Sequence, residues 1–130
     1  ASLAACALRE AEEEVGLPAT SAEVIGFLDD YPTFTRYRVT PVVALVDPPA
    51  QFVSDPAEVA EIFEIPLALV LDESAYVQQS LNRDGVKVPF FELRHERHRI
   101  WGATAGMLRS LMHKMRQPPH WPRGAAPCAV

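Results

Sequence analysis

The segment Arg9-Glu10-Ala11-Glu12-Glu13-Glu14-Val15-Gly16-Leu17 is the most informative stretch of this 130-residue chain. Glu10, Glu13 and Glu14 stand at positions i, i+3 and i+4, so a helix places their carboxylates on one face. Like charges at these spacings repel by about 0.2–0.5 kcal/mol per pair, and a bound hard cation such as Mg²⁺ relieves that repulsion. A metal site is therefore one reading. The other is a solvated acidic face, because Glu is a good helix former.

The same segment lies at the end of a predicted helix over residues 2–15. Ser2 can cap the first turn, Gly16 can end the helix, and Pro18 blocks its continuation. An apolar stripe is expected to face the core, which leaves the carboxylates toward a cleft or solvent. The stripe consists of Leu3, Ala7, Ala11 and Val15.

The rest of the chain predicts a mixed α+β domain. Pro41 is expected at an edge position or bulge, and Asp84-Gly85 predicts a hairpin turn. The expected strands are 23–28, 34–46, 58–65, 76–81, 86–93 and 98–101, with helices at 67–71 and 102–116. In the last helix, core packing is expected from Thr104, Met107, Leu108, Leu111 and Met115.

Composition limits the classes of function. A hydrophobic content of 48% suffices for a core, and a net charge of −5 argues against a general nucleic-acid surface. No apolar run approaches the length of a membrane span. Cys6 and Cys128 are not expected to form a disulfide, which fits a reducing, cytoplasmic location.

One motif of this chain resembles the second half of the Nudix box, G-x5-E-x7-R-E-U-x-E-E-x-G-U, where U is apolar. The motif is Arg9-Glu10-x-x-Glu13-Glu14-x-Gly16 followed by an apolar residue. The first half would lie at or before Ala1, so we expect the chain to be truncated at its N-terminus within the box. The resemblance implies an α/β/α sandwich with a mixed sheet between helices and with its first strands missing. The Nudix domain would cover residues 1–116, and a Pro-rich, disordered tail residues 117–130.

Further stretches resemble the coenzyme A diphosphatase branch, namely residues 39–48, 58–67, 91–92 and 100–108. This resemblance implies hydrolysis of the pyrophosphate of coenzyme A, or a derivative, to 3′,5′-ADP and 4′-phosphopantetheine with Mg²⁺ or Mn²⁺ as cofactor. Many relatives form homodimers. Open alternatives are another nucleoside diphosphate-X substrate such as ADP-ribose, a Nudix-like domain that binds without hydrolysis, and a module with a purely structural divalent ion. The 130 residues alone are expected to be weakly active or inactive.

By the same resemblance, Glu10, Glu13 and Glu14 are metal ligands, and Glu10 also orients or deprotonates the attacking water. Arg9 is expected to position a carboxylate by pairing with it. Glu58 is the preferred further ligand from a later loop.

Glu61 is the second candidate for that further ligand. Arg36 and Arg38 are expected to contact substrate phosphates, with ordinary surface arginines as the alternative. The basic run over residues 94–99 either meets a 3′-phosphate or forms a solvated hairpin end, and the hairpin end is preferred.

Overall fold

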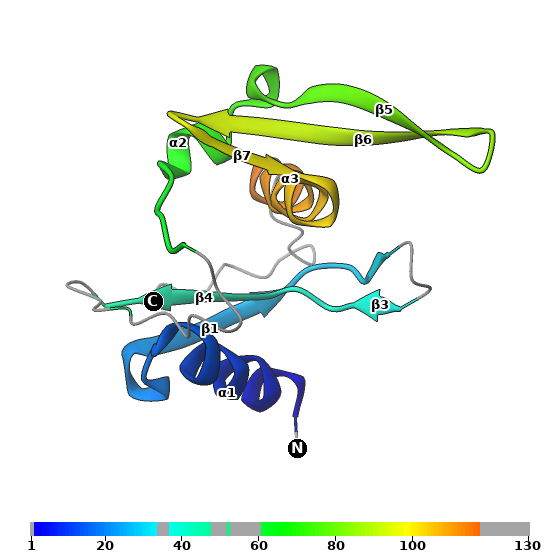
Figure 1. The fold of residues 1–130 in the computed structure, drawn as a ribbon. Helices are drawn as coiled ribbons and strands as arrows, with labels where there is room; N and C mark the ends of the chain where they lie inside the picture. The colour runs from blue at the N-terminus through cyan, green and yellow to red at the C-terminus, as the bar shows by residue number, and fades with distance from the viewer. Residues whose placement is uncertain (1, 34–36, 48–51, 53–60, 118–130) are drawn as a thin grey trace, which may run out of the picture.

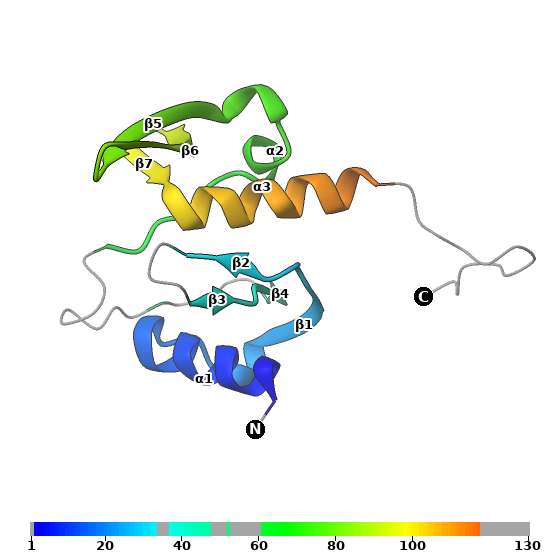
Figure 2. The ribbon, with the colours of Figure 1, turned by 90° about the vertical axis from the view of Figure 1, so that its right-hand side faces the viewer.

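The computed structural model describes residues 2–33, 37–47, 52 and 61–117. Its elements form stacked layers (Figures 1 and 2). Helix α1 (Leu3–Val15) covers one side of the strand pair β1 (Ala22–Phe27) and β4 (Val42–Val46), and helix α3 (Gly102–Arg116) lies on the other side. The sheet β5–β6–β7 covers the far side of α3. The predicted α+β class is confirmed, with α1, the β1–β4 pair and α3 in α/β/α order.

Helix α1 begins and ends where its capping residues predict. The Ser2 side chain accepts a hydrogen bond from the Ala5 N–H (3.0 Å), which satisfies one of the helix's free donors. Gly16 ends the helix in the left-handed region with φ 71°, and its N–H donates to the Glu12 carbonyl (3.0 Å). No residue of α1 is fully buried, and Leu3 is 60% exposed. The expected apolar stripe is therefore only partly covered by the β1–β4 pair.

The strand predicted over residues 34–46 is interrupted, and residues 34–36 lie outside the described part. Its described part forms β3 (Arg38–Val39) and then β4. Pro41 stands between them without an N–H to donate, while its carbonyl accepts from the Leu28 N–H at 3.0 Å. The structure therefore has a break between two strands at Pro41, where an edge position or a bulge within one strand was expected.

Antiparallel pairing joins β1 to β4 and β2 (Tyr31–Pro32) to β3. A short 3₁₀ turn, η1 (Ala19–Ser21), leads into β1. The register of β1 against β4 shifts between Val24 and Gly26, so the bulge lies in β1. All strand pairs among the described residues are antiparallel.

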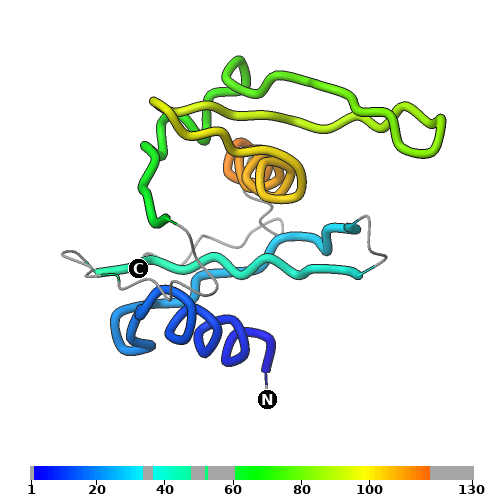
Figure 3. Tube along the Cα trace, viewed as in Figure 1, coloured from blue at the N-terminus to red at the C-terminus, as the bar shows by residue number. Residues whose placement is uncertain are grey.

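The strand predicted over residues 58–65 is wrong in its described part, because residues 61–66 have no regular structure. Phe63 stacks on His98, and Ile65 packs against the core. Side-chain contacts rather than a hydrogen-bond ladder hold this segment, and the spacing of its apolar residues reflects those contacts. Figure 3 shows it in green, running from the level of the β1–β4 pair to the three-stranded sheet.

Two short helical turns follow, α2 (Leu67–Val70) and η2 (Glu73–Ala75), and α2 begins after Pro66 as predicted. The three-stranded sheet then forms from β5 (Val77–Arg83), β6 (Val86–His95) and β7 (His98–Trp101).

The β5–β6 turn is the predicted Asp84-Gly85 pair, with φ values of 52° and 78°. Positive φ at both residues is the requirement of a type I′ hairpin turn.

The core lies between α3 and the β6–β7 strands. Its buried members are Tyr76, Leu93, Ile100, Ala105 and Met112. The predicted boundaries of α3 are confirmed, but the predicted core stripe is partly wrong, because Thr104 is exposed and Met115 is 52% exposed. Helix α3 contacts strands on both of its sides, so small residues such as Gly106 are buried there.

Candidate metal and substrate site

The three motif carboxylates lie on the outer layer of the molecule. Glu10, Glu13 and Glu14 are all exposed on α1, at the predicted helical spacing. Within the described part of the chain, none of them makes a hydrogen bond or an ion pair. Their oxygens are therefore free of competing cations.

The donor chemistry of this face fits a hard divalent cation, because carboxylate oxygens are the ligands that Mg²⁺ and Mn²⁺ prefer. As the side chains stand, the described residues hold no group of three or more His, Cys, Asp or Glu that could bind a metal ion. Exposed Glu side chains are long and can change rotamer, so convergence on an ion would require such changes. Glu10, Glu13 and Glu14 are the residues of α1 that would hold the ion.

Arg9 pairs with no carboxylate among the residues that the structure describes, contrary to expectation. Its Nη2 donates to the Cys6 Sγ at 3.7 Å, one turn earlier on the same helix. Cys6 is a partly buried free thiol, and Cys128 lies outside the described residues. In this arrangement Arg9 covers its own helix and leaves the carboxylate face unpaired.

Two of the predicted site residues, Glu58 and Arg36, lie outside the described residues. Arg38 is exposed on β3, opposite Pro32 in the register of β2 and β3. It makes no ion pair with any residue that the structure describes. Both readings of Arg38, a phosphate contact and an ordinary surface arginine, fit this position.

Glu61, the second candidate for a loop ligand, is engaged by two basic side chains. Arg97 Nη2 contacts its Oε1, and His98 Nε2 lies 3.2 Å from the same oxygen. These hydrogen bonds, first from His98 and then from Arg97, hold the pKa of the Glu61 carboxyl below its usual value. With Arg97 and His98 both at this oxygen, Glu61 holds the 61–66 segment against the β6–β7 turn, and this contact replaces the metal-ligand role considered for it.

The basic run over residues 94–99, which spans the end of β6 and the start of β7, is largely neutralised by carboxylates. Glu92 is buried at 5% exposure, and Arg94 Nε lies 3.5 Å from it while Arg99 Nε contacts its other oxygen. Since a buried carboxylate requires such compensation, these arginines have a structural task in the sheet. The structure supports the expectation that this run is a hairpin end rather than a free basic patch.

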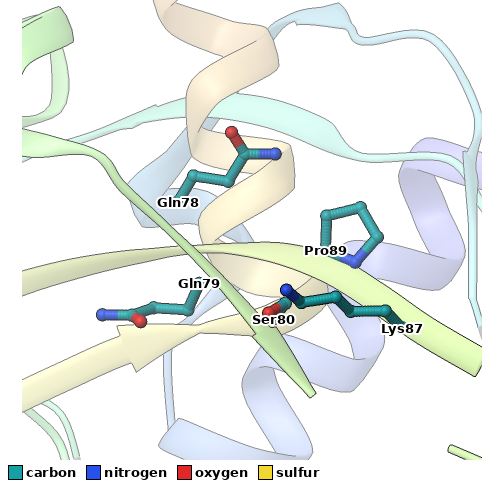
Figure 4. A pocket seen from close by; sticks show the side chains of 5 residues that line it. All are labelled: Gln78, Gln79, Ser80, Lys87 and Pro89. Atoms are coloured by element: carbon teal, nitrogen blue, oxygen red, sulfur yellow. The ribbon is translucent and has the colours of Figure 1, made fainter. Parts of the chain in front are cut away.

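An open cavity of about 480 Å³ lies on the β5–β6 hairpin. Figure 4 shows the side chains that line it: Gln78, Gln79, Ser80, Lys87 and Pro89. It contains no carboxylate and lies across α3 from α1 (Figure 1), so it adds nothing to the metal face.

A smaller cavity of about 300 Å³ lies beside β7, and neither the motifs nor the apolar periodicity predicted it. Arg99 and Trp101 from β7 line it together with Phe63. The alternation of Arg99 and Trp101 on one strand face was the available signal.

Comparison with known proteins identifies the family of this chain. The NUDIX domain family matches residues 1–83, which include α1 and the β1–β4 pair. The chain belongs to the Nudix family. Three curated relatives carry the name "Uncharacterized Nudix hydrolase NudL". They come from Escherichia coli O1:K1 / APEC, Escherichia coli O157:H7 (strain EC4115 / EHEC) and Shigella boydii serotype 18.

Each of these NudL proteins is 40% identical to this Nudix chain over 111 residues. The match covers 85% of this chain, which spans 58% of the length of each relative. Among the residues that the structure describes, no helix is long and apolar enough to cross a membrane.

Proposed function

We propose that this Nudix chain is part of a metal-dependent hydrolase that cleaves the pyrophosphate bond of coenzyme A or a derivative of it. The observation that carries the proposal is the face of α1. Three exposed carboxylates lie there within the family match, and none of them pairs with another residue of the described part of the chain. The hydrolase names of the NudL relatives agree with the reaction class. Support for coenzyme A as substrate comes from the stretches that resemble the coenzyme A diphosphatases.

The chemistry follows from the charge of the substrate. A pyrophosphate is anionic and repels hydroxide, and a bound Mg²⁺ or Mn²⁺ would neutralise that charge and make water a better nucleophile. Glu10, Glu13 and Glu14 are the residues that hold the ion in this proposal. Glu10 also orients the attacking water or accepts its proton. Glu58 is proposed as the further ligand, and Arg36 and Arg38 as phosphate contacts.

The test is hydrolysis of coenzyme A with Mg²⁺ or Mn²⁺, followed by mass spectrometry. It uses the 130-residue chain and a longer version that includes the expected first half of the Nudix box. The expected products are 3′,5′-ADP and 4′-phosphopantetheine. Glu14→Gln should reduce kcat by more than the roughly 10–100-fold that loss of an outer-shell partner costs a metal site.

Glu12→Gln is the matched control. Glu12 is exposed on the same helix but stands two residues from Glu10 and from Glu14, outside their shared face. It should keep near-normal activity. An equal loss in both variants would point to a general charge effect and contradict the metal assignment.

Substrate comparison separates the alternatives. Cleavage of ADP-ribose without cleavage of coenzyme A would keep the hydrolase and discard the coenzyme A assignment. If the longer version cleaves neither compound with either metal, the hydrolase proposal fails and the non-catalytic binding domain takes its place. We expect the 130-residue chain to be weakly active or inactive, and equal rates for the two versions would contradict that expectation.

A further inference from the structure

The outer edge of β5 is long and regular. In the sheet order β5–β6–β7, β5 is an outermost strand, so this edge has no strand partner among the residues that the structure describes. All seven residues of β5 pair in register with β6, and every one except Leu81 is exposed. Alternate residues of a strand direct their N–H and C=O groups away from the paired neighbour, so β5 presents a row of unpaired backbone groups.

β5 also lacks the features that normally block an open edge. Such edges are usually short, or a proline, a bulge or a charged residue interrupts them. β5 contains no proline, its pairing shows no register shift, and its one charged residue, Arg83, stands at its end. By comparison, β7 at the opposite edge of the described sheet is four residues long and carries Arg99 in its interior. β5 is therefore the edge of this sheet that is open to another strand.

The side chains of β5 are complementary to those of a second β5 that runs in the opposite direction. Ser80 is the middle residue of the strand, so antiparallel pairing of two β5 edges about Ser80 lets all seven residues pair. Gln78 then lies opposite Asn82 of the second copy, and Ser80 lies opposite Ser80. Amides and hydroxyls both donate and accept hydrogen bonds, so these pairs can satisfy each other. Arg83 lies opposite Val77, so no like charges meet directly.

The polar side chains of β5 lie on the face of the sheet that is turned toward α3. Gln78 pairs with Phe91, which packs against the core between the sheet and α3, and cross-strand partners share a face. Ser80 follows on the same face, because side chains alternate along a strand. Together with Lys87 and Pro89, these two residues border the open cavity of about 480 Å³ (Figure 4). This polar surface suits the amide and hydroxyl side chains of a second β5.

The two ends of β5 carry opposite charge. Within the described residues, the turn end is net positive and the segment before the strand is net negative. These charges belong to Arg83, Asp84 and Lys87 at the turn, and to Asp72, Glu73 and Arg116, which lies 3.7 Å from Glu73, before the strand. Antiparallel pairing brings the positive end of each copy toward the negative end of the other. This arrangement offsets the repulsion between two chains that each have a net charge of −5.

We propose that a second copy of this chain docks on the outer edge of β5, in antiparallel register about Ser80, and joins the two three-stranded sheets into one continuous sheet. Because Ser80 pairs with itself, the two-fold axis is perpendicular to the sheet, and both α3 helices lie on the same face. β5 lies across α3 from α1 (Figures 1 and 2). The inference is therefore independent of the carboxylate face and goes beyond the proposed hydrolysis.

The test is sedimentation equilibrium of the 130-residue chain and of the longer version, which should both form dimers. Ser80→Lys places two lysines opposite each other on the axis, and Ser80→Glu places two glutamates there. Each substitution should raise the dissociation constant of the dimer by about ten-fold or more, because like charges then face each other. An equimolar mixture of the two variants should form a heterodimer again, because a lysine then faces a glutamate. A variant that had simply failed to fold could not recover in this way.

Thr20→Lys is the matched control, because Thr20 is exposed in η1, away from β5. It should dimerise like the wild type, and an equal loss in Thr20→Lys and Ser80→Lys would contradict the proposed surface. Either version of the wild type that stays monomeric overturns the proposal. So does an unchanged dissociation constant in Ser80→Lys, or a mixture of Ser80→Lys and Ser80→Glu that stays monomeric.

Discussion

Substitution of Gly106 by alanine tests the packing of β2 against α3. Gly106 is buried in α3, where the side chain of Tyr31 from β2 packs against it. A Cβ built on Gly106 would lie 2.5 Å from Tyr31 Cε2 and 2.6 Å from Cζ. Real carbon atoms do not approach so closely, so either the Tyr31 ring or α3 must move.

Two opposing effects set the size of the change. Overpacking of a filled site costs about 1–3 kcal/mol. Alanine in a helix interior is more favourable than glycine by about 1 kcal/mol. We therefore expect Gly106→Ala to lower the free energy of unfolding by up to about 2 kcal/mol. In a Tyr31→Leu background the ring is gone, and the same substitution should raise the free energy of unfolding by about 1 kcal/mol.

The decisive quantity is the coupling between the two substitutions in a double-mutant cycle, measured by urea unfolding. We expect a coupling energy of about 1–3 kcal/mol, which is the steric term alone. Tyr31→Phe is the matched control, because the ring carbons nearest to the new Cβ remain and the clash should persist. Additive effects within about 0.5 kcal/mol would refute the reasoning and show that Tyr31 does not join β2 to α3.

Three further substitutions test local features. Gly85→Ala should lower the free energy of unfolding by about 1–2 kcal/mol in urea titrations, because φ is 78° there. Tyr76→Phe should cost about 1 kcal/mol by the same measurement, because the Tyr76 hydroxyl donates to the Val70 carbonyl at 2.6 Å. Glu61→Gln should remove one component of the acid dependence of stability. Because the pKa of Glu61 is lowered in the folded chain, its contribution is present above its ordinary value of 4.5 and is lost as the pH falls below it. Thermal melts of the wild type and Glu61→Gln should therefore differ more at pH 7 than at pH 3.

Elements with local signals were predicted well. Helix α1 begins after Ser2 and ends before Gly16, and α3 covers residues 102–116, as expected. The Asp84-Gly85 turn was also recognised, because two positive φ values are needed where two strands are joined by two residues. Caps and tight turns depend on residues within a few positions of each other, so their sequence is sufficient evidence.

Features that depend on distant contacts were predicted poorly. The apolar residues after residue 60 suggested a strand, yet Phe63 is held by His98, 35 positions later in the chain. In α3, the buried residues include Ala105 and Met112 rather than Met115, because strands pack on both sides of the helix. No local pattern reports which strand will pack on which face.

In the candidate site, too, local features were predicted from the sequence and features that depend on distant contacts were not. The position of Glu10, Glu13 and Glu14 on one helix face was predicted from the sequence, because helical periodicity alone places them together. The neutralisation of the basic run by Glu92, the engagement of Glu61, and the cavity between Phe63 and Trp101 were decided only by the tertiary structure. Each of these joins groups from different strands or segments, and their charges and surfaces meet only after the chain has folded.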